Sequence, residues 1–122
     1  METTITSRLS FQLQLVVKSV KEHIDAHPLD WGSMDDFCSL AGINRKTLQR
    51  SFKQEYGVRI SDHQLMKRME AAADMLRNGR LSQKQIAARC GYHKANNLSR
   101  AFKKVYKCAP TEWRSECVVQ MN

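Results

Sequence analysis

The chain has no long apolar stretch and few residues that break helices. No apolar run approaches the roughly 20 residues of a membrane-spanning helix, and the N-terminus lacks the basic start and long apolar segment of a signal peptide. Only two prolines and five glycines occur in 122 residues, and no segment alternates polar and apolar residues as a half-buried strand does. These absences predict an all-α protein that stays in the cytoplasm, without a membrane span.

The histidines and cysteines form no recognisable chemical site. Neither a C-x-x-C pair nor a zinc-like ligand spacing occurs, and no nucleophile or glycine-rich phosphate loop accompanies the scattered histidines. We therefore expect no enzyme, no metal and no cofactor. Without a secretion signal, the cysteines are predicted to be reduced, with Cys38 and Cys90 in the core. A redox or metal sensor built on Cys108 and Cys117 is the alternative.

Positive charge is abundant and is concentrated in the middle of the chain. The formal net charge is +8, and residues 43–107 hold 16 of the 20 Lys and Arg residues but only four acidic ones. The rest of the chain has four basic and eight acidic residues. A basic block with acidic flanks indicates a polyanionic partner such as DNA. A solvated lysine-rich surface is the alternative interpretation.

An eight-residue pattern occurs twice, 50 positions apart. Residues 46–53 read KTLQRSFK and residues 96–103 read NNLSRAFK. In each copy Leu and Phe are four residues apart, so they share one face of a helix. A different face carries Lys, Gln, Arg and Lys in the first copy, and Asn, Ser, Arg and Lys in the second. Each copy is thus predicted to be a helix with one apolar face for the core and one polar face for bases and phosphates.

Apolar periodicity and capping residues predict seven helices. We expect them at residues 9–26, 33–41, 45–56, 61–77, 82–90, 94–106 and 110–117. Ser33, Asn44 and Ser82 are suitable N-caps, and Gln85 completes a capping box with Ser82. Residues 118–122 are expected to fray.

These helices form two similar helix-turn-helix units. The predicted fold is an all-α, seven-helix bilobal domain in which a long linker helix joins the two units. Residues 1–57 form the N-terminal helix and the first unit, residues 58–79 the linker helix, and residues 80–122 the second unit with the C-terminal helix.

The polar faces supply the candidate DNA contacts. Arg50 and Arg100 suit guanine, while Gln49 and Asn96 suit adenine. Lys46 can reach a guanine or a phosphate. The expected contacts to the DNA backbone are Arg45, Lys53, Lys94, Asn97, Lys103 and Lys104. For Arg50 and Arg100 the alternative is a structural ion pair with an acidic residue, and Arg68 is predicted to be structural.

Several segments together resemble the DNA-binding domain of the AraC/XylS family of bacterial transcription regulators. The matching segments are AGIN (41–44), LQRSFK (48–53), Tyr56-Gly57, residues 68–76, IA (86–87), CGY (90–92), residues 98–104, Pro110 and WR (113–114). The resemblance implies promoter binding, usually for activation through RNA polymerase. It places the base-reading positions at Lys46, Gln49 and Arg50 in the first unit, and at Ala95, Asn96 and Arg100 in the second.

The second unit departs from the family pattern. Lys107 stands where the family usually has glycine, and Ala109 stands where Ser or Thr usually precedes the proline. Ala95 has no group that can hydrogen-bond a base. We therefore expect the second unit to read fewer bases and to act more through phosphates.

These observations predict a sequence-specific regulator of transcription that binds double-stranded DNA. Two units in one chain predict an asymmetric, bipartite site of about 15–20 bp, with half-sites roughly 10 bp apart. The protein is either a stand-alone regulator or the output domain of a larger one whose sensor domain lies outside this chain. A protein-interaction module that keeps the fold without binding DNA is the alternative function.

Overall fold

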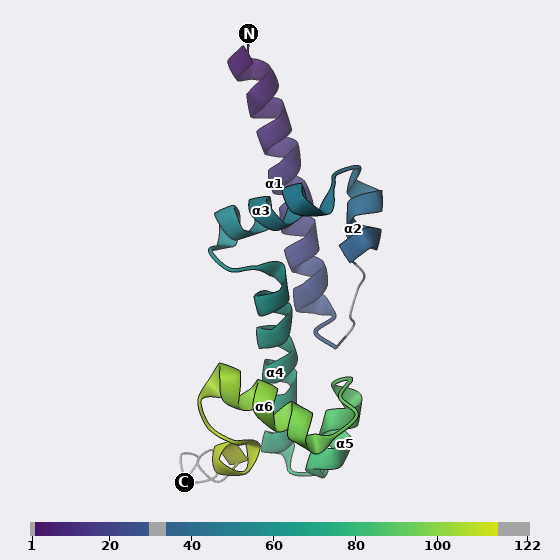
Figure 1. Cartoon of the computed structure of the whole chain (residues 1–122), viewed down its shortest axis with the longest axis vertical. Coiled ribbons are helices and arrows are strands. Elements are labelled where there is room, and N and C mark those ends of the chain that lie inside the picture. Colours follow the sequence, from purple (N-terminus) through teal and green to yellow (C-terminus); the bar gives the residue numbers. More distant parts are fainter. Residues whose placement is uncertain (1, 30–33, 115–122) are drawn as a thin grey trace. The chain divides into compact units, whose positions relative to one another are not determined.

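The computed structural model describes residues 2–29 and 34–114. Within these ranges it has seven helices and no strand, which confirms the all-α prediction. Six are labelled in Figure 1: α1 (Glu2–Ala26), α2 (Met34–Ala41), α3 (Arg45–Tyr56), α4 (Ile60–Asn78), α5 (Gln83–Arg89) and α6 (Ala95–Tyr106). The seventh covers residues 110–114 and reaches the end of the described region. No helix in this part of the chain is long and apolar enough to span a bilayer.

Most helix boundaries agree with the sequence prediction to within one or two residues, but α1 does not. The expected start at residue 9 was wrong, because α1 begins at Glu2. Residues 2–8 contain no proline or glycine that would prevent the helix from extending. The predicted N-cap Ser33, the end of the last helix and the expected fraying of residues 118–122 lie outside the described residues.

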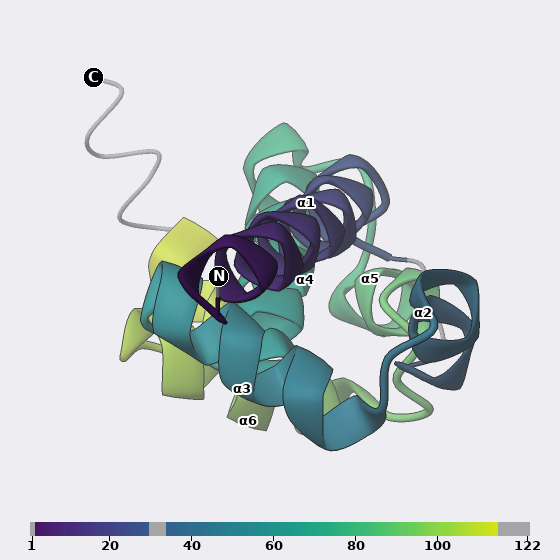
Figure 2. The same ribbon diagram turned by 90° about the horizontal axis from the view of Figure 1, so that it is seen from above.

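The chain forms two compact units, Met1–Gln64 and Leu65–Asn122, and the boundary falls within α4. In the first unit α3 lies across α1 (Figures 1 and 2). The buried core of this unit comes from α1, α3 and the first residue of α4, and it consists of Val17, Val20, Ile24, Leu48, Phe52 and Ile60. The apolar faces of α1 and α3 that the sequence predicted are thus the faces that pack.

The second unit buries apolar residues from the remainder of α4, from α5 and from α6. These residues are Met69, Ala72, Ala73, Leu76, Ile86, Ala87, Cys90, Leu98 and Phe102. The Arg114 guanidinium donates hydrogen bonds to the carbonyl oxygens of Leu76 (3.0 Å) and Leu81 (3.2 Å). These bonds tie the last helix to the end of α4 and to the segment that follows it.

The internal duplication extends beyond the two helices in which the sequence revealed it. The Gly57 N–H donates to the Lys53 carbonyl at 2.7 Å, and the Lys107 N–H donates to the Lys103 carbonyl at 2.8 Å, so α3 and α6 end in the same way. Equivalent aromatic pairs follow, with ring centroids 5.8 Å apart for Phe52 and His63 and 5.9 Å apart for Phe102 and Trp113. The 50-residue correspondence therefore includes the loop after each helix and the start of the next one.

Candidate nucleic-acid interface

Local sequence determines how α3 begins, ends and turns. The Asn44 side-chain oxygen accepts a hydrogen bond from the Thr47 N–H at 2.8 Å, which caps the helix as predicted. Gly57 closes the helix with a φ of 76°, a conformation that glycine adopts without a steric cost. Leu48 and Phe52 are fully buried. The opposite side of α3 therefore faces away from the core.

The outward face of α3 brings the predicted binding residues of the first unit together. Lys46, Gln49, Arg50 and Lys53 are all exposed, and all four line one surface hollow of about 460 Å³. Arg59, in the loop before α4, lines the same hollow. The concave surface therefore gathers four cationic side chains and one amide, a combination that suits phosphates and base edges.

Sequence reasoning missed Arg59. Helical periodicity assigns residues to faces only within a helix, and Arg59 lies outside α3 in the turn that follows Gly57. The available signal was its place in the basic block, two residues after the glycine that ends the helix.

The arginines of α3 and α6 differ in their ionic contacts. Arg45 pairs with Asp35 of α2 at 2.9 Å, with both side chains more than half exposed. Arg50 and Arg100 are exposed and form no ion pair with any residue in the described ranges. The structural alternative for these two arginines thus gains no support, while Arg45 has a role in joining α2 to α3. Its predicted DNA contact stays a prediction.

In α6 the predicted residues lie on the surface opposite a buried apolar face. Leu98 and Phe102 are fully buried. Ala95 is half-buried, and the exposed residues are Lys94, Asn96, Asn97, Arg100, Lys103 and Lys104. Lys94 occupies the N-cap position, but its side chain makes no capping hydrogen bond. The start of α6 therefore lacks the stabilisation that Asn44 gives α3.

Two predicted structural residues of the second unit are buried. Arg68, in α4, is 5% exposed, so it is part of the interior of the second unit and not of a binding surface. Cys90 is fully buried, and burial raises the pKa of its thiol although the nearby Arg68 charge opposes the shift. A thiol with a raised pKa stays protonated and unreactive. Its predicted packing role is confirmed.

Two of the other three cysteines lie in the part of the chain that the structure describes. Cys38 and Cys108 are half-buried, and Cys117 lies outside the described residues. Across residues 2–29 and 34–114, no group of His, Cys, Asp and Glu is arranged to hold a metal ion. The proposed sensor pair of Cys108 and Cys117 stays a hypothesis.

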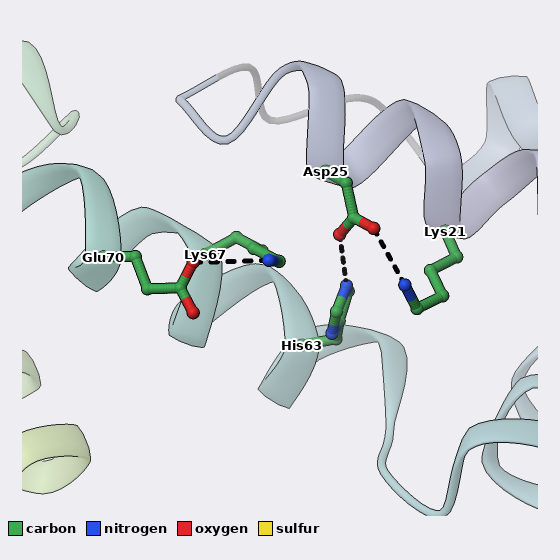
Figure 3. Close-up of polar contacts among 5 residues, drawn as sticks. All are labelled: Lys21, Asp25, His63, Lys67 and Glu70. Atoms are coloured by element: carbon green, nitrogen blue, oxygen red, sulfur yellow. Dashed lines mark hydrogen bonds and ion pairs between the residues drawn. The ribbon is translucent and has the colours of Figure 1, made fainter.

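A polar network joins α1 to the start of α4 within the first unit. His63 is 5% exposed, and its Nε2 lies 2.7 Å from Oδ1 of Asp25. The Lys21 ammonium donates to Oδ2 of the same carboxylate at 2.8 Å (Figure 3). Partial burial of Asp25 raises its pKa, but the hydrogen bonds from Lys21 and His63 outweigh this effect and lower it. The network therefore gives His63 a structural role that the sequence did not reveal.

A helix-turn-helix domain family matches residues 37–116, more than half of the chain. A curated relative, the HTH-type transcriptional activator RhaR of Mannheimia succiniciproducens, is 37% identical over 83 residues. Those residues are 68% of this chain and 30% of the relative. The chain spans about a third of the length of the curated relatives it matches.

Two solved structures are similar over most of both chains. The first is a transcriptional regulator from Chromobacterium violaceum, of the AraC-type DNA-binding domain-containing proteins; it has a TM-score of 0.75 and 26% identity, and the match covers 85% of this chain and 93% of that one. The second is the C-terminal domain of AraT, a response regulator from Geobacillus stearothermophilus. It has a TM-score of 0.74 and 27% identity, with 83% and 84% of the two chains covered.

Proposed function

Because the chain belongs to the helix-turn-helix family of AraC-type DNA-binding domains, we propose that it binds double-stranded DNA through α3 and α6 and regulates transcription. The observation that carries this proposal is the outward face of α3. Its exposed Lys46, Gln49, Arg50 and Lys53 share one hollow, on a helix that Leu48 and Phe52 anchor to the core. A rigidly held helix with exposed, convergent donors is suited to the major groove.

Each side chain of the first unit has a role that its chemistry suggests. Arg50 donates two hydrogen bonds to guanine O6 and N7, and Gln49 pairs with adenine N6 and N7. Lys46 reaches a guanine or a phosphate. Lys53, one turn further along α3, neutralises a phosphate, and Arg59 does the same from the rim of the hollow. Arg45 is a weaker candidate, because Asp35 already holds its guanidinium.

The second unit binds with less base specificity. Arg100 and Asn96 are its base-reading side chains, and Ala95 contributes only an apolar contact. Lys94, Asn97, Lys103 and Lys104 bind the sugar-phosphate backbone; all four are exposed. Two non-identical units in one chain give an asymmetric, bipartite site with half-sites about 10 bp apart.

Activation is the proposed outcome of binding, with RNA polymerase as the protein partner. The relative named RhaR is described as a transcriptional activator, and this chain corresponds to about a third of it. We also propose that this chain is the output domain of a longer regulator that contains a sensor domain. DNA recognition is assigned to α3 and α6, both of which this chain contains, so it can be tested without RNA polymerase or a sensor domain.

The test is the selection of bound duplexes from a random pool at about 150 mM salt, since weak non-specific binding is screened under these conditions. We expect an asymmetric motif of two blocks, one helical turn apart, of which the first unit's block is better defined. A single block would restrict base reading to one unit. An absence of enrichment would contradict DNA recognition and would favour a protein-interaction module.

Substitutions in α3 and in α6 show which unit recognises which block of the selected DNA motif. Arg50→Ala is expected to remove the preference at one guanine, at a cost of about 1–3 kcal/mol for the matched site only. Asn96→Ala and Arg100→Ala are expected to change the sequence preference less than Arg50→Ala does, because the second unit binds mainly through phosphates. A sharp change of preference in either of these two variants would show that the second unit reads bases as well as the first does.

A further inference from the structure

Lys107 has a backbone conformation that its side chain disfavours. Its φ is 65°, and it is the one non-glycine residue with a positive φ in the part of the chain that the structure describes. At the equivalent C-cap of α3 the residue is Gly57, with a φ of 76°. Both caps form the same N–H to carbonyl hydrogen bond. The lysine therefore adds nothing to the cap that glycine does not supply with less strain.

The helix dipole does not explain why position 107 is a lysine. A cation near a helix C-terminus is favourable, but Lys103 and Lys104 already lie in the last turn of α6. In α3 the same end has Lys53 alone in its last turn, followed by a neutral glycine. A third positive charge at the end of α6 thus adds repulsion between like charges as well as backbone strain.

The N-terminal end of α6 also has a lysine where a helix-capping residue is favoured. Lys94 occupies the N-cap without a capping hydrogen bond, whereas Asn44 caps α3. A cation at this end also opposes the helix dipole. Both ends of α6 therefore have a lysine where local stability favours a small or neutral residue. Such departures from local consistency are typical of functional positions.

The start of α6 lacks the two cations that the start of α3 has. Arg45 and Lys46 of α3 correspond to Ala95 and Asn96 of α6 at the 50-residue offset. The polar stripe of the second unit therefore has one cation fewer than that of the first, because Asn96 stands in place of Lys46. In helix-turn-helix proteins the N-terminal residues of the recognition helix contact base edges, so a side chain at the C-terminal end, such as Lys107, is placed to meet the DNA backbone.

We propose that Lys107 is a phosphate-binding residue that, together with Lys94, holds the second unit on the DNA backbone at both ends of α6. Lys107 is exposed, so its ammonium is accessible to a phosphate. The inference rests on the proposed function, and it adds a residue outside the recognition helix to the binding surface. The strained backbone at Lys107 persists because replacement by glycine would remove one phosphate contact.

The test compares Lys107→Gly and Lys107→Arg with the unaltered protein. Dissociation constants are measured over a series of salt concentrations, for the selected duplex and for a scrambled duplex, and melting temperatures are measured in parallel. We expect Lys107→Gly to raise the melting temperature by about 2–6 °C through relief of strain. It should also weaken binding to both duplexes and lower the salt slope by roughly 0.9. Lys107→Arg keeps the positive charge, so it should have the salt slope of the unaltered protein and show no gain in melting temperature.

Lys18→Gln, at an exposed position on α1, is the control for a general loss of positive charge. It should leave the salt slope nearly unchanged. If Lys107→Gly leaves the slope as in the unaltered protein, the inference is overturned while the proposed function stands. If the unaltered protein binds neither duplex, the proposed function fails and the inference fails with it.

Discussion

Replacement of Asp25 by asparagine tests whether the buried end of the polar network stabilises the first unit. Asp25 accepts hydrogen bonds from His63, whose side chain is 6% exposed, and from Lys21, whose side chain is 35% exposed. Hydrogen bonds to charged groups contribute about 1.5–3 kcal/mol, but the Asp25 side chain is itself 32% exposed, so solvent screens part of this. We expect Asp25→Asn to lower the free energy of unfolding by about 1–2 kcal/mol in urea denaturation at neutral pH.

The pH dependence of that difference follows from the lowered pKa of Asp25. The folded protein holds this carboxyl ionised below its usual pKa of 3.8, with Lys21 and His63 as the hydrogen-bond donors. The carboxylate's contribution is therefore complete above 3.8 and is lost as the pH falls through the lower, folded-state pKa. We expect the stabilities of the unaltered protein and Asp25→Asn to converge as the pH falls through that range.

Lys21→Met is the control, because it removes the exposed partner and leaves the buried one. It should cost less stability than Asp25→Asn does. Equal stability of Asp25→Asn and the unaltered protein at neutral pH would refute the reasoning. A stability difference between the two proteins that stays constant until Asp25 is fully protonated would also refute it. The effect would then not depend on the charge of Asp25.

The remaining predictions concern packing, capping and phosphate binding. Phe52→Ala and Phe102→Ala should each cost about 3–5 kcal/mol of stability, since both rings are fully buried; a melting curve like that of the unaltered protein would show that the ring is not part of the core. Asn44→Ala should cost about 1 kcal/mol, and Lys94→Asn should gain about 0.5–1 kcal/mol by supplying the missing cap of α6; urea denaturation that ranks them oppositely would contradict the capping argument. Lys53→Ala should lower the salt slope of DNA binding by roughly 0.9, and an unchanged slope would remove Lys53 from the phosphate contacts.

Features that depend on residues close in sequence were predicted correctly. Ser82 and Gln85 form the expected capping box, in which the Gln85 N–H donates to the Ser82 hydroxyl at 3.2 Å and the Ser82 N–H to the Gln85 side chain at 2.9 Å. Three residues of separation determine that geometry, whatever the rest of the chain does. The buried stripes of α3 and α6 follow equally from the helical repeat. The start of α1 was not predicted, because no strong capping or breaking residue marks it.

The candidate binding site was predicted as a set of residues, but not as a surface. Periodicity placed Lys46, Gln49, Arg50 and Lys53 on one face of a helix. It gave no means of adding Arg59, which joins their hollow only because of the way the chain turns after Gly57. The strain at Lys107 was also invisible in sequence, where a lysine in place of glycine was only a departure from a family pattern.

The fold class, the helix caps and the polar faces of α3 and α6 followed from residues three to four positions apart, whose interactions form within a single helix. The pairing of His63 with Asp25, 38 residues away, depended on the packing of the first residues of α4 against α1 within the first unit. The salt bridge between Arg45 and Asp35 likewise depended on the packing of α2 against α3. Such contacts join side chains on different helices, so their geometry exists only after the apolar faces have packed. Tertiary structure alone therefore decided which charged residues pair with one another across helices, as His63 does with Asp25 and Arg45 with Asp35.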